Sequence, residues 1–420
     1  MLDGVLAAAC EEALARRTVP GAAIGVLARD EVETQGFGVL DLRTREPVGP
    51  ESTFRIASIT KPFTANLALS LSRSGLVGLD EEVPGPVAGV TVAHLLAHAG
   101  GFEGECGDLA RFGEDDDALP RLVAELGAQR ALVPPGELWS YCNAGYWLLA
   151  QFLADRAGST YEDVLAASVL RPLGLERTDF GSPEAVGHEP VASGDPRHAP
   201  VVDVYPRARR ASGGLVSNVD DLLTFARSQL ATAESAPLRL PVVETPNGSY
   251  GLGFALERAG DLELWGHTGS YGGFESLLVL VPERGFAFAG LTNSGRGGLA
   301  LDEILDVALE RELGVRREQP ATVPLPTAEL ELLAGRYRNP ELELEVLAET
   351  DRLALDAVQI DSRTGASTPS PRLRARSLGG RLFALAGSDW DGHRFDFHPR
   401  VGEPRFVRFG SRLAERVSDA

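Results

Sequence analysis

The residues that could do chemistry begin with a serine and a lysine three positions apart, Ser58 and Lys61, within residues 53–64. Lys61 is the only lysine among 420 residues. Arginine stays protonated at any working pH, whereas a buried lysine can lose its proton and act as a base. A serine hydroxyl needs such a base within hydrogen-bond distance to become a good nucleophile. The pattern therefore predicts that Ser58 is a nucleophile and that Lys61 activates it.

The local pattern around Ser58 agrees with this prediction. Apolar residues recur at helical spacing over residues 58–72. Pro62 is tolerated only in the first turn of a helix, so it sets the helix start close to Ser58. The positive end of the helix dipole then favours an oxyanion at Ser58. Lys61, three residues further on, shares the same helix face.

Two further stretches carry groups that could complete a site. Tyr141 and Asn143 form a Y-x-N pattern, in which the phenol is a second candidate base and the amide can orient a substrate. A tyrosinate held beside a cation can serve as a base, so the choice between Lys61 and Tyr141 stays open. The other stretch ends a predicted strand and reads His267-Thr268-Gly269-Ser270.

In this order, S-x-x-K, Y-x-N and H-T-G resemble the serine β-lactamase and penicillin-binding protein superfamily. The resemblance is to its class C-like branch, which holds D-aminopeptidases, HTG-type D-alanyl-D-alanine carboxypeptidases and β-lactamase-like esterases. It covers roughly residues 5–315. The wording of four other stretches is also similar to this branch, namely residues 54–58, 94–98, 135–141 and 212–215.

The resemblance implies roles for the motif residues. Lys61 and Tyr141 would cooperate in acylation of Ser58, and the backbone N–H groups of Ser58 and Ser270 would form the oxyanion hole. In the lactamase form a lysine stands where this chain has His267, which argues against strong β-lactamase activity and suits peptidases and esterases. The implied substrate-binding residues are Asn143, His267, Thr268, Gly269 and Ser270.

Within residues 1–315 helical spacing lies at both ends, strand-like runs come early and late, and a helical block lies between them. This predicts an α/β fold, in which an antiparallel sheet is flanked by helices and carries an inserted helical subdomain. Residues 1–315 are interpreted as a β-lactamase-like catalytic domain. The predicted elements are helices over 3–17, 58–72, 92–98, 119–132, 144–157, 161–170, 217–230 and 299–313, a hairpin over 22–39, and strands over 250–257, 263–268, 275–281 and 285–292.

The end of the chain differs in composition. Residues 316–326 contain three prolines and no periodicity, which is typical of a linker. Residues 327–420 hold short alternating runs that predict a small all-β domain. The resemblance implies that this domain is a lipocalin-like barrel, packed on the catalytic domain and limiting access to its cleft.

Composition excludes several classes of partner. A formal net charge of −20 argues against nucleic acid and anionic membrane surfaces. No uncharged apolar run is long enough to span a bilayer, and the start lacks the basic region of a signal peptide. Three cysteines without a C-x-x-C pattern fit a reducing compartment. We therefore expect a cytoplasmic protein whose partner is a small molecule; the sequence does not indicate its oligomeric state.

Other residues allow two interpretations. His94 and His98 could share a metal ion, but no third ligand is apparent, so structural roles are favoured and neither a metal nor a cofactor is predicted. Residues 207–210 are interpreted as a solvated basic loop rather than an anion site. Cys142 could be a reactive thiol, although burial is favoured. Three aromatic residues could equally line the cleft or pack in the core, namely Trp139, Tyr146 and Phe274.

These observations predict a serine hydrolase that works through an acyl-enzyme. The expected substrate is a small ester or a D-amino-acid amide or peptide. One alternative is an acyltransferase or peptide cyclase of the penicillin-binding-protein-type thioesterase kind. The other is a sensor or scaffold that binds an acyl compound without turning it over.

Overall fold

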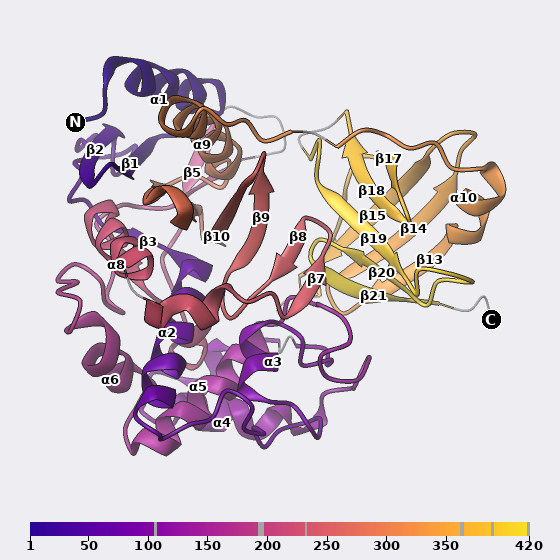
Figure 1. Cartoon of the computed structure of the whole chain (residues 1–420), viewed down its shortest axis with the longest axis horizontal. Coiled ribbons are helices and arrows are strands. Elements are labelled where there is room, and N and C mark those ends of the chain that lie inside the picture. The colour runs from indigo at the N-terminus through magenta and orange to yellow at the C-terminus, as the bar shows by residue number, and fades with distance from the viewer. Residues whose placement is uncertain are drawn as a thin grey trace.

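The computed structural model describes residues 1–104, 107–191, 197–231, 233–318, 320–361, 365–387 and 390–417. Figure 1 shows two parts side by side along the long axis of the molecule. A larger part contains the N-terminus, and a barrel (orange to yellow) lies beside it. Within the described ranges, no helix is both long enough and apolar enough to cross a membrane.

The larger part is organised around an antiparallel sheet with the order β2-β1-β12-β11-β10-β9-β8-β7. Strand β1 pairs with β12, which brings Ile24 opposite Gly290, so the sheet joins the two ends of this part as predicted. Its strands are β1 (Gly21–Ala28), β2 (Glu31–Gly38), β7 (Val243–Thr245), β8 (Gly248–Tyr250), β9 (Ala255–Ala259), β10 (Leu262–Tyr271), β11 (Phe274–Val281) and β12 (Phe286–Thr292).

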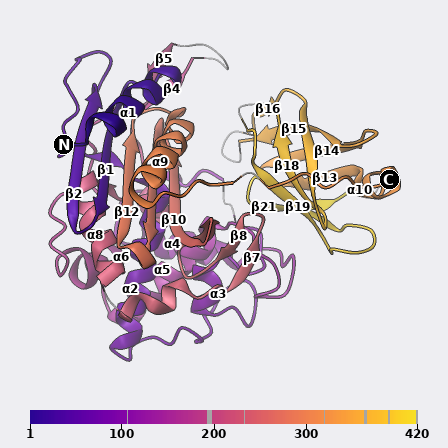
Figure 2. The same cartoon turned by 45° about the horizontal axis from the view of Figure 1, so that its top comes forward.

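The two faces of the sheet bury different helices, because successive strand residues point to opposite sides. In β1, Ile24 joins a core cluster with α1 (Gly4–Arg16) and α9 (Gly297–Leu313). Ala23 joins the larger cluster on the other face, together with α2 (Thr60–Arg73) and α8 (Val219–Ala231). The layers separate clearly in Figure 2, where α1 and α9 lie on the near side of the sheet.

The inserted helical block lies below the sheet in Figure 1. Its helices are α3 (Val92–Leu96), α4 (Ala118–Glu125), α5 (Asn143–Ala157), α6 (Tyr161–Leu165), continued by a π-helical turn (Ala166–Leu170), and α7 (Arg210–Gly213). Short strand pairs join distant loops, namely β3 (Phe54–Arg55) with β6 (Val216–Ser217), and β4 (His188–Pro190) with β5 (His198–Pro200).

Two predicted elements are wrong in extent. The helix expected over 119–132 ends in a 3-10 turn, Leu126–Ala128, and Ala131 instead forms a β-bridge with Phe102. The strand expected over 250–257 is divided between β8 and β9 by a tight turn. Gly253 adopts φ +86° there, and the N–H of Gly251 donates to the Phe254 carbonyl.

The smaller part is a closed eight-stranded antiparallel barrel, because β14 pairs with both β13 and β15, and β16 adds to β15. Its elements are α10 (Thr327–Leu333), β13 (Gly335–Asn339), β14 (Leu342–Ala348), β15 (Leu353–Ile360), β16 (Ser367–Pro369), β17 (Leu373–Gly379), β18 (Leu382–Ala386), β19 (Arg394–His398), β20 (Phe406–Phe409) and β21 (Arg412–Arg416). The predicted all-β barrel is confirmed. The described residues between α9 and α10 form neither helix nor strand; the domain boundaries stay a prediction.

Candidate active site

Ser58 lies in a 3-10 turn, Ala57–Ile59, between β3 and the start of α2 at Thr60. Pro62 falls in the first turn of α2, where it disturbs no helical hydrogen bond, as predicted. Ala57 adopts φ +45°, a left-handed conformation that is uncommon for a residue with a side chain. Strain of this kind clusters at functional sites, and here it lies directly before the candidate nucleophile.

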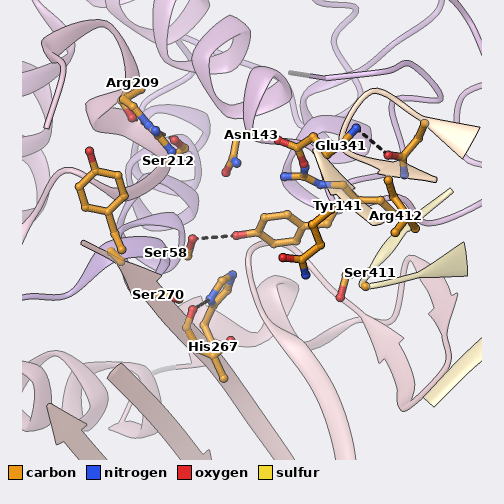
Figure 3. A pocket seen from close by; sticks show the side chains of 18 of the residues that line it. Ser58, Tyr141, Asn143, Arg209, Ser212, His267, Ser270, Glu341, Ser411 and Arg412 are labelled. Atoms are coloured by element: carbon orange, nitrogen blue, oxygen red, sulfur yellow. Dashed lines mark hydrogen bonds and ion pairs between the residues drawn. The ribbon is translucent and has the colours of Figure 1, made fainter. Parts of the chain in front are cut away.

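The three predicted catalytic residues meet at one atom. Lys61 Nζ lies 3.0 Å from Ser58 Oγ, and the Tyr141 hydroxyl lies 2.9 Å from the same oxygen. Lys61 is fully buried and also donates to the Ser212 carbonyl at 2.6 Å. Its Nζ lies 4.8 Å from the centre of the Tyr141 ring. Figure 3 shows Ser58 and Tyr141 pointing towards one another, with His267 close by.

His267 is buried in β10, and its Nδ1 lies 2.6 Å from the Thr268 carbonyl oxygen. Burial and, after it, the nearby charge of Lys61 lower the pKa of His267 to about 3. The imidazole is therefore neutral near pH 7. Unlike a lysine, it adds no second positive charge beside Lys61, and it offers a substrate a neutral polar group.

Gly269 explains how β10 reaches the nucleophile. A Cβ at this position would overlap the Ile56 carbonyl oxygen and Ser276 Oγ, and would lie 3.1 Å from Ser58 N. Ser276 Oγ donates to the Ile56 carbonyl at 2.8 Å, which ties β11 to the same turn. Glycine is thus required because the strand backbone approaches the Ser58 turn this closely.

The Y-x-N pattern spans the start of α5, with Asn143 as its first helical residue. Cys142 is buried, and its N–H donates to His98 Nδ1 at 3.0 Å. The His98 ring packs 4.1 Å from the Tyr141 ring. Burial holds the pKa of His98 well below its usual value. His94 accepts from the Thr91 N–H in a capping box. Both histidines therefore have structural partners, and the described residues contain no cluster of three or more metal-ligating side chains.

A cavity of about 580 Å³ opens over Ser58 and is shared by the two parts of the molecule. The larger part supplies its floor, which contains Ala57, Ser58, Tyr141, Asn143, Tyr205, Arg209, Ser212, Gly213, His267, Thr268, Ser270 and Tyr271. The barrel supplies its roof, which contains Asn339, Glu341, Leu342, Gln359, Ile360, Phe409, Gly410, Ser411 and Arg412. Figure 3 shows Arg209 on one side of Ser58, and Glu341 with Arg412 on the other.

Several cavity residues were not predicted. Tyr205, Arg209 and Tyr271 form an aromatic and cationic group in which the Arg209 guanidinium lies 5.0 Å and 5.2 Å from the two ring centres. The interpretation of residues 207–210 as a solvated loop is wrong, because they form a 3-10 turn that leads into α7, and the half-buried Arg207 and Arg210 both pair with Glu162. The closeness of this segment to the motif at 212–215 was the available signal.

The aromatic residues considered for the cleft are core residues instead. Trp139, Tyr146 and Phe274 are all buried, and none of them lines the cavity. Tyr146 donates to the Leu96 carbonyl at 2.8 Å. Cys10 and Cys142 are free thiols buried in the protein, while Cys106 lies outside the described residues. Core packing is thus the correct alternative for these aromatic side chains.

A model of the family described as beta-lactamase matches residues 6–310. The chain belongs to the β-lactamase family. It is 29% identical to penicillin-binding protein 4 of Amycolatopsis lactamdurans over 357 residues, covering 76% of this chain and 93% of that protein. It is 27% identical to the D-aminopeptidase of Gluconobacter oxydans over 383 residues, covering 82% of this chain and 68% of that protein.

A full-length structural neighbour is also found. The crystal structure of SurE aligns with 98% of each chain, at a TM-score of 0.77 and 27% identity, and SurE also has a crystal structure with D-Leu. The predicted superfamily and fold class are confirmed. The chain is thus a member of a serine hydrolase family with the β-lactamase fold that has D-aminopeptidase among its relatives.

Proposed function

We propose that this protein hydrolyses small esters or D-amino-acid amides and peptides through an acyl-enzyme on Ser58. The observation that carries the proposal is the meeting of Lys61 Nζ and the Tyr141 hydroxyl at Ser58 Oγ, at 3.0 Å and 2.9 Å. A hydroxyl with two proton-transfer groups in hydrogen-bond contact, opening into a cavity, has the arrangement of an activated nucleophile.

In the first step Ser58 Oγ attacks the substrate carbonyl carbon and gives up its proton. Since Lys61 and Tyr141 both reach Oγ, one can take this proton while the other delivers a proton to the departing alcohol or amine. The bond from the carbonyl carbon to the leaving group then breaks and leaves the acyl group on Ser58. In the second step water attacks the carbonyl carbon of this ester and gives a proton to one of the same two groups. The bond from the carbonyl carbon to Ser58 Oγ then breaks, Oγ takes a proton back, and the free acid is released.

The backbone around Ser58 supports an oxyanion hole made of the N–H groups of Ser58 and Ser270. Because Gly269 has no side chain, β10 can lie directly against the Ser58 turn. A Cβ at Gly269 would lie 3.1 Å from Ser58 N. One such donor contributes about 3 kcal/mol of transition-state stabilisation. Ser270 Oγ meanwhile donates to Glu275 at 2.6 Å, which orients this end of β10.

The substrate class rests on the cavity and on the relatives. A volume of about 580 Å³ suits a small molecule rather than a polymer. His267 presents a neutral imidazole where lactamases carry a cation, which favours amides and esters over β-lactams. One relative is a D-aminopeptidase, and the structural neighbour SurE has a structure with D-Leu. Asn143, Thr268 and His267 would orient the acyl group.

The test is a turnover panel of p-nitrophenyl butyrate, D- and L-alanine p-nitroanilides and a penicillin. We expect hydrolysis of the ester and of the D-anilide, and none in Ser58→Ala. A matched control is Ser74→Ala at the other end of α2, where Oγ donates only to a helix carbonyl. Activity that survives in Ser58→Ala, or no turnover of any acyl donor by the wild-type protein, would contradict the proposal.

The same panel separates the two alternatives. With D-leucine added as an acceptor, an acyltransferase would form the N-acyl product in place of the free acid. A sensor would accumulate a lasting acyl group on Ser58 without releasing product. Rapid release of free acid in the presence of D-leucine is the result expected of the proposed hydrolase.

A further inference from the structure

We propose that Arg408 of the barrel is a positioning residue for Tyr141. The barrel then has two roles: it forms the roof of the cavity, and it holds the segment that carries Tyr141 in place. This inference rests on the proposed function, because it assumes that Tyr141 moves a proton at Ser58. It concerns the chain segment 139–142, which carries Tyr141 and belongs to neither a helix nor a strand.

On one side, the segment is held by His98 at the end of the α3 region. The Ser140 N–H donates to the His98 carbonyl at 3.0 Å, and the Cys142 N–H donates to His98 Nδ1 at 3.0 Å. In an extended chain successive N–H groups point to opposite sides. The N–H of Tyr141, between these two, therefore points away from His98.

On that opposite side, the segment is held by the β20–β21 hairpin of the barrel. The Tyr141 N–H donates to the Ser411 carbonyl at 2.9 Å. The Leu413 N–H donates to Ser140 Oγ at 3.2 Å, and Arg408 Nη1 donates to the Trp139 carbonyl at 3.3 Å. Three consecutive residues of the segment thus depend on the barrel for a hydrogen bond.

Among the barrel residues that hold this segment, Arg408 is fixed by the most hydrogen bonds. It is 1% exposed, and it donates through Nε and Nη2 to the two oxygens of Asp396, at 2.9 Å and 2.6 Å. It also donates to the Glu244 carbonyl of β7 at 2.9 Å. Burial opposes ionisation of Asp396, but hydrogen bonds from His398 and Arg408 lower its pKa overall. This fixed, charged pair lies at the junction of barrel, β7 and the Tyr141 segment.

Apolar side chains also pack between the hairpin and the larger part. Leu132 and Val133 of the larger part form one buried cluster with Phe406 and Leu413 of the hairpin. At its edge Arg130 pairs with Glu415 at 2.6 Å. The hairpin is thus rigidly seated, and so is the backbone of Tyr141. A displacement of about 1 Å in such a group costs on the order of 100-fold in rate.

The experiment is a double-mutant cycle on the first-turnover acylation of Ser58 by p-nitrophenyl butyrate. Arg408→Ala is measured in the wild-type protein and in Tyr141→Phe. We expect it to slow acylation by about tenfold or more in the wild-type background, with KM changed by less than about twofold, and to have almost no effect in Tyr141→Phe. Arg408→Lys, which keeps the charge, is expected to recover part of the rate.

The matched control is Arg372→Ala, which removes an equivalent pair of hydrogen bonds to Asp356 on the exposed surface of the barrel. It should leave acylation unchanged. Thermal unfolding of each variant shows whether it is folded. If Arg408→Ala does not fold, Asp396→Asn keeps the shape of the site and is carried through the same cycle with the same expectation.

The outcomes are distinct. An equal loss of rate in the wild-type and Tyr141→Phe backgrounds would overturn the inference, since Arg408 would then act on stability or on the whole site rather than through Tyr141. A wild-type protein that is never acylated would instead overturn the proposed function. If Arg408→Ala slows acylation in the wild-type background but not in Tyr141→Phe, Arg408 is established as a positioning residue.

Discussion

On the floor of the cavity, the Tyr141 hydroxyl contacts Ser58 Oγ, and the fully buried Lys61, which does not itself line the cavity, contacts the same oxygen. On the roof, Glu341 and Arg412 form an ion pair whose side chains remain 30% and 23% exposed. Under the proposed function the groups around Ser58 must hold protons at fixed positions, so their residue types would not be interchangeable. The roof bounds the space above Ser58, and under the proposed function it would contact parts of a substrate that do not react.

Substitutions near Ser58 should therefore change the rate of the chemical step, whereas substitutions on the roof should change substrate selectivity. Buried proton-transfer groups depend on exact distances, so small changes there act on kcat. A partly exposed ion pair contributes little to stability, because water screens it. Four predictions test this contrast, in order of decreasing effect.

The largest effect is expected for Lys61→Arg. The variant keeps the positive charge but loses the group that can release a proton, so kcat/KM should fall by about 1,000-fold or more. Steady-state hydrolysis of p-nitrophenyl butyrate measures this. The reverse exchange at the exposed end of the same helix, Arg73→Lys, is the control and should be neutral. Near-normal turnover in Lys61→Arg would show that Lys61 does not transfer a proton.

Gly269→Ala should come next, with a loss of about 100-fold in kcat. The new methyl group would collide with the Ile56 carbonyl and Ser276 Oγ, and so push β10 away from Ser58. Gly127→Ala, where the added Cβ meets open space, is the matched control. If Gly269→Ala retained full activity, the close approach of β10 to Ser58 would not be required for catalysis.

Substitutions on the roof should affect activity less, and should change KM rather than kcat. Glu341→Gln and Arg412→Gln each break the roof ion pair. We expect kcat for p-nitrophenyl butyrate to change by less than about twofold, while KM for a D-amino-acid peptide rises several-fold. Comparing the two substrates in parallel measures this. An equal fall in kcat for both would show that the roof takes part in the chemistry.

The smallest effect is expected for Glu275→Gln, which should change how the stability of the protein depends on pH. Burial raises the pKa of Glu275 to about 8, against 4.5 for the free side chain. The folded protein therefore keeps a proton that the unfolded chain releases between these values, so the contribution of Glu275 to the free energy of unfolding falls as pH rises from about 4.5 to about 8. Glu275→Gln should flatten the decline of Tm over this range. An unchanged slope would mean that Glu275 is ionised in the folded state.

The same contrast explains what could be predicted from the sequence. The residues around Ser58, Tyr141 and His267 lie in short motifs whose chemistry can be recognised locally, and the structure brings them together. Glu341 and Arg412 belong to no motif, because they reach the cavity only through the closure and docking of the barrel. Arg408 gave no signal either, since one arginine in an alternating strand is not distinguishable from its exposed neighbours.

Errors in the secondary structure have a similar origin. The run over 250–257 has the composition of one strand, yet Gly253 turns the chain between β8 and β9. The apolar spacing over 119–132 continues past the end of α4, but residue Ala131 is recruited into a bridge with Phe102. In both places a contact distant in sequence, or one glycine conformation, prevails over the local pattern.

In the proposed mechanism Ser58 carries the acyl group during turnover. The most direct test is the intact mass of the wild-type protein, quenched in acid shortly after mixing with p-nitrophenyl butyrate, followed by peptide mapping. We predict a butyryl group on the peptide that contains Ser58, rising and then decaying as product appears, and absent from Ser58→Ala. Turnover without this adduct, or with the acyl group on another residue such as Cys142, would contradict this mechanism.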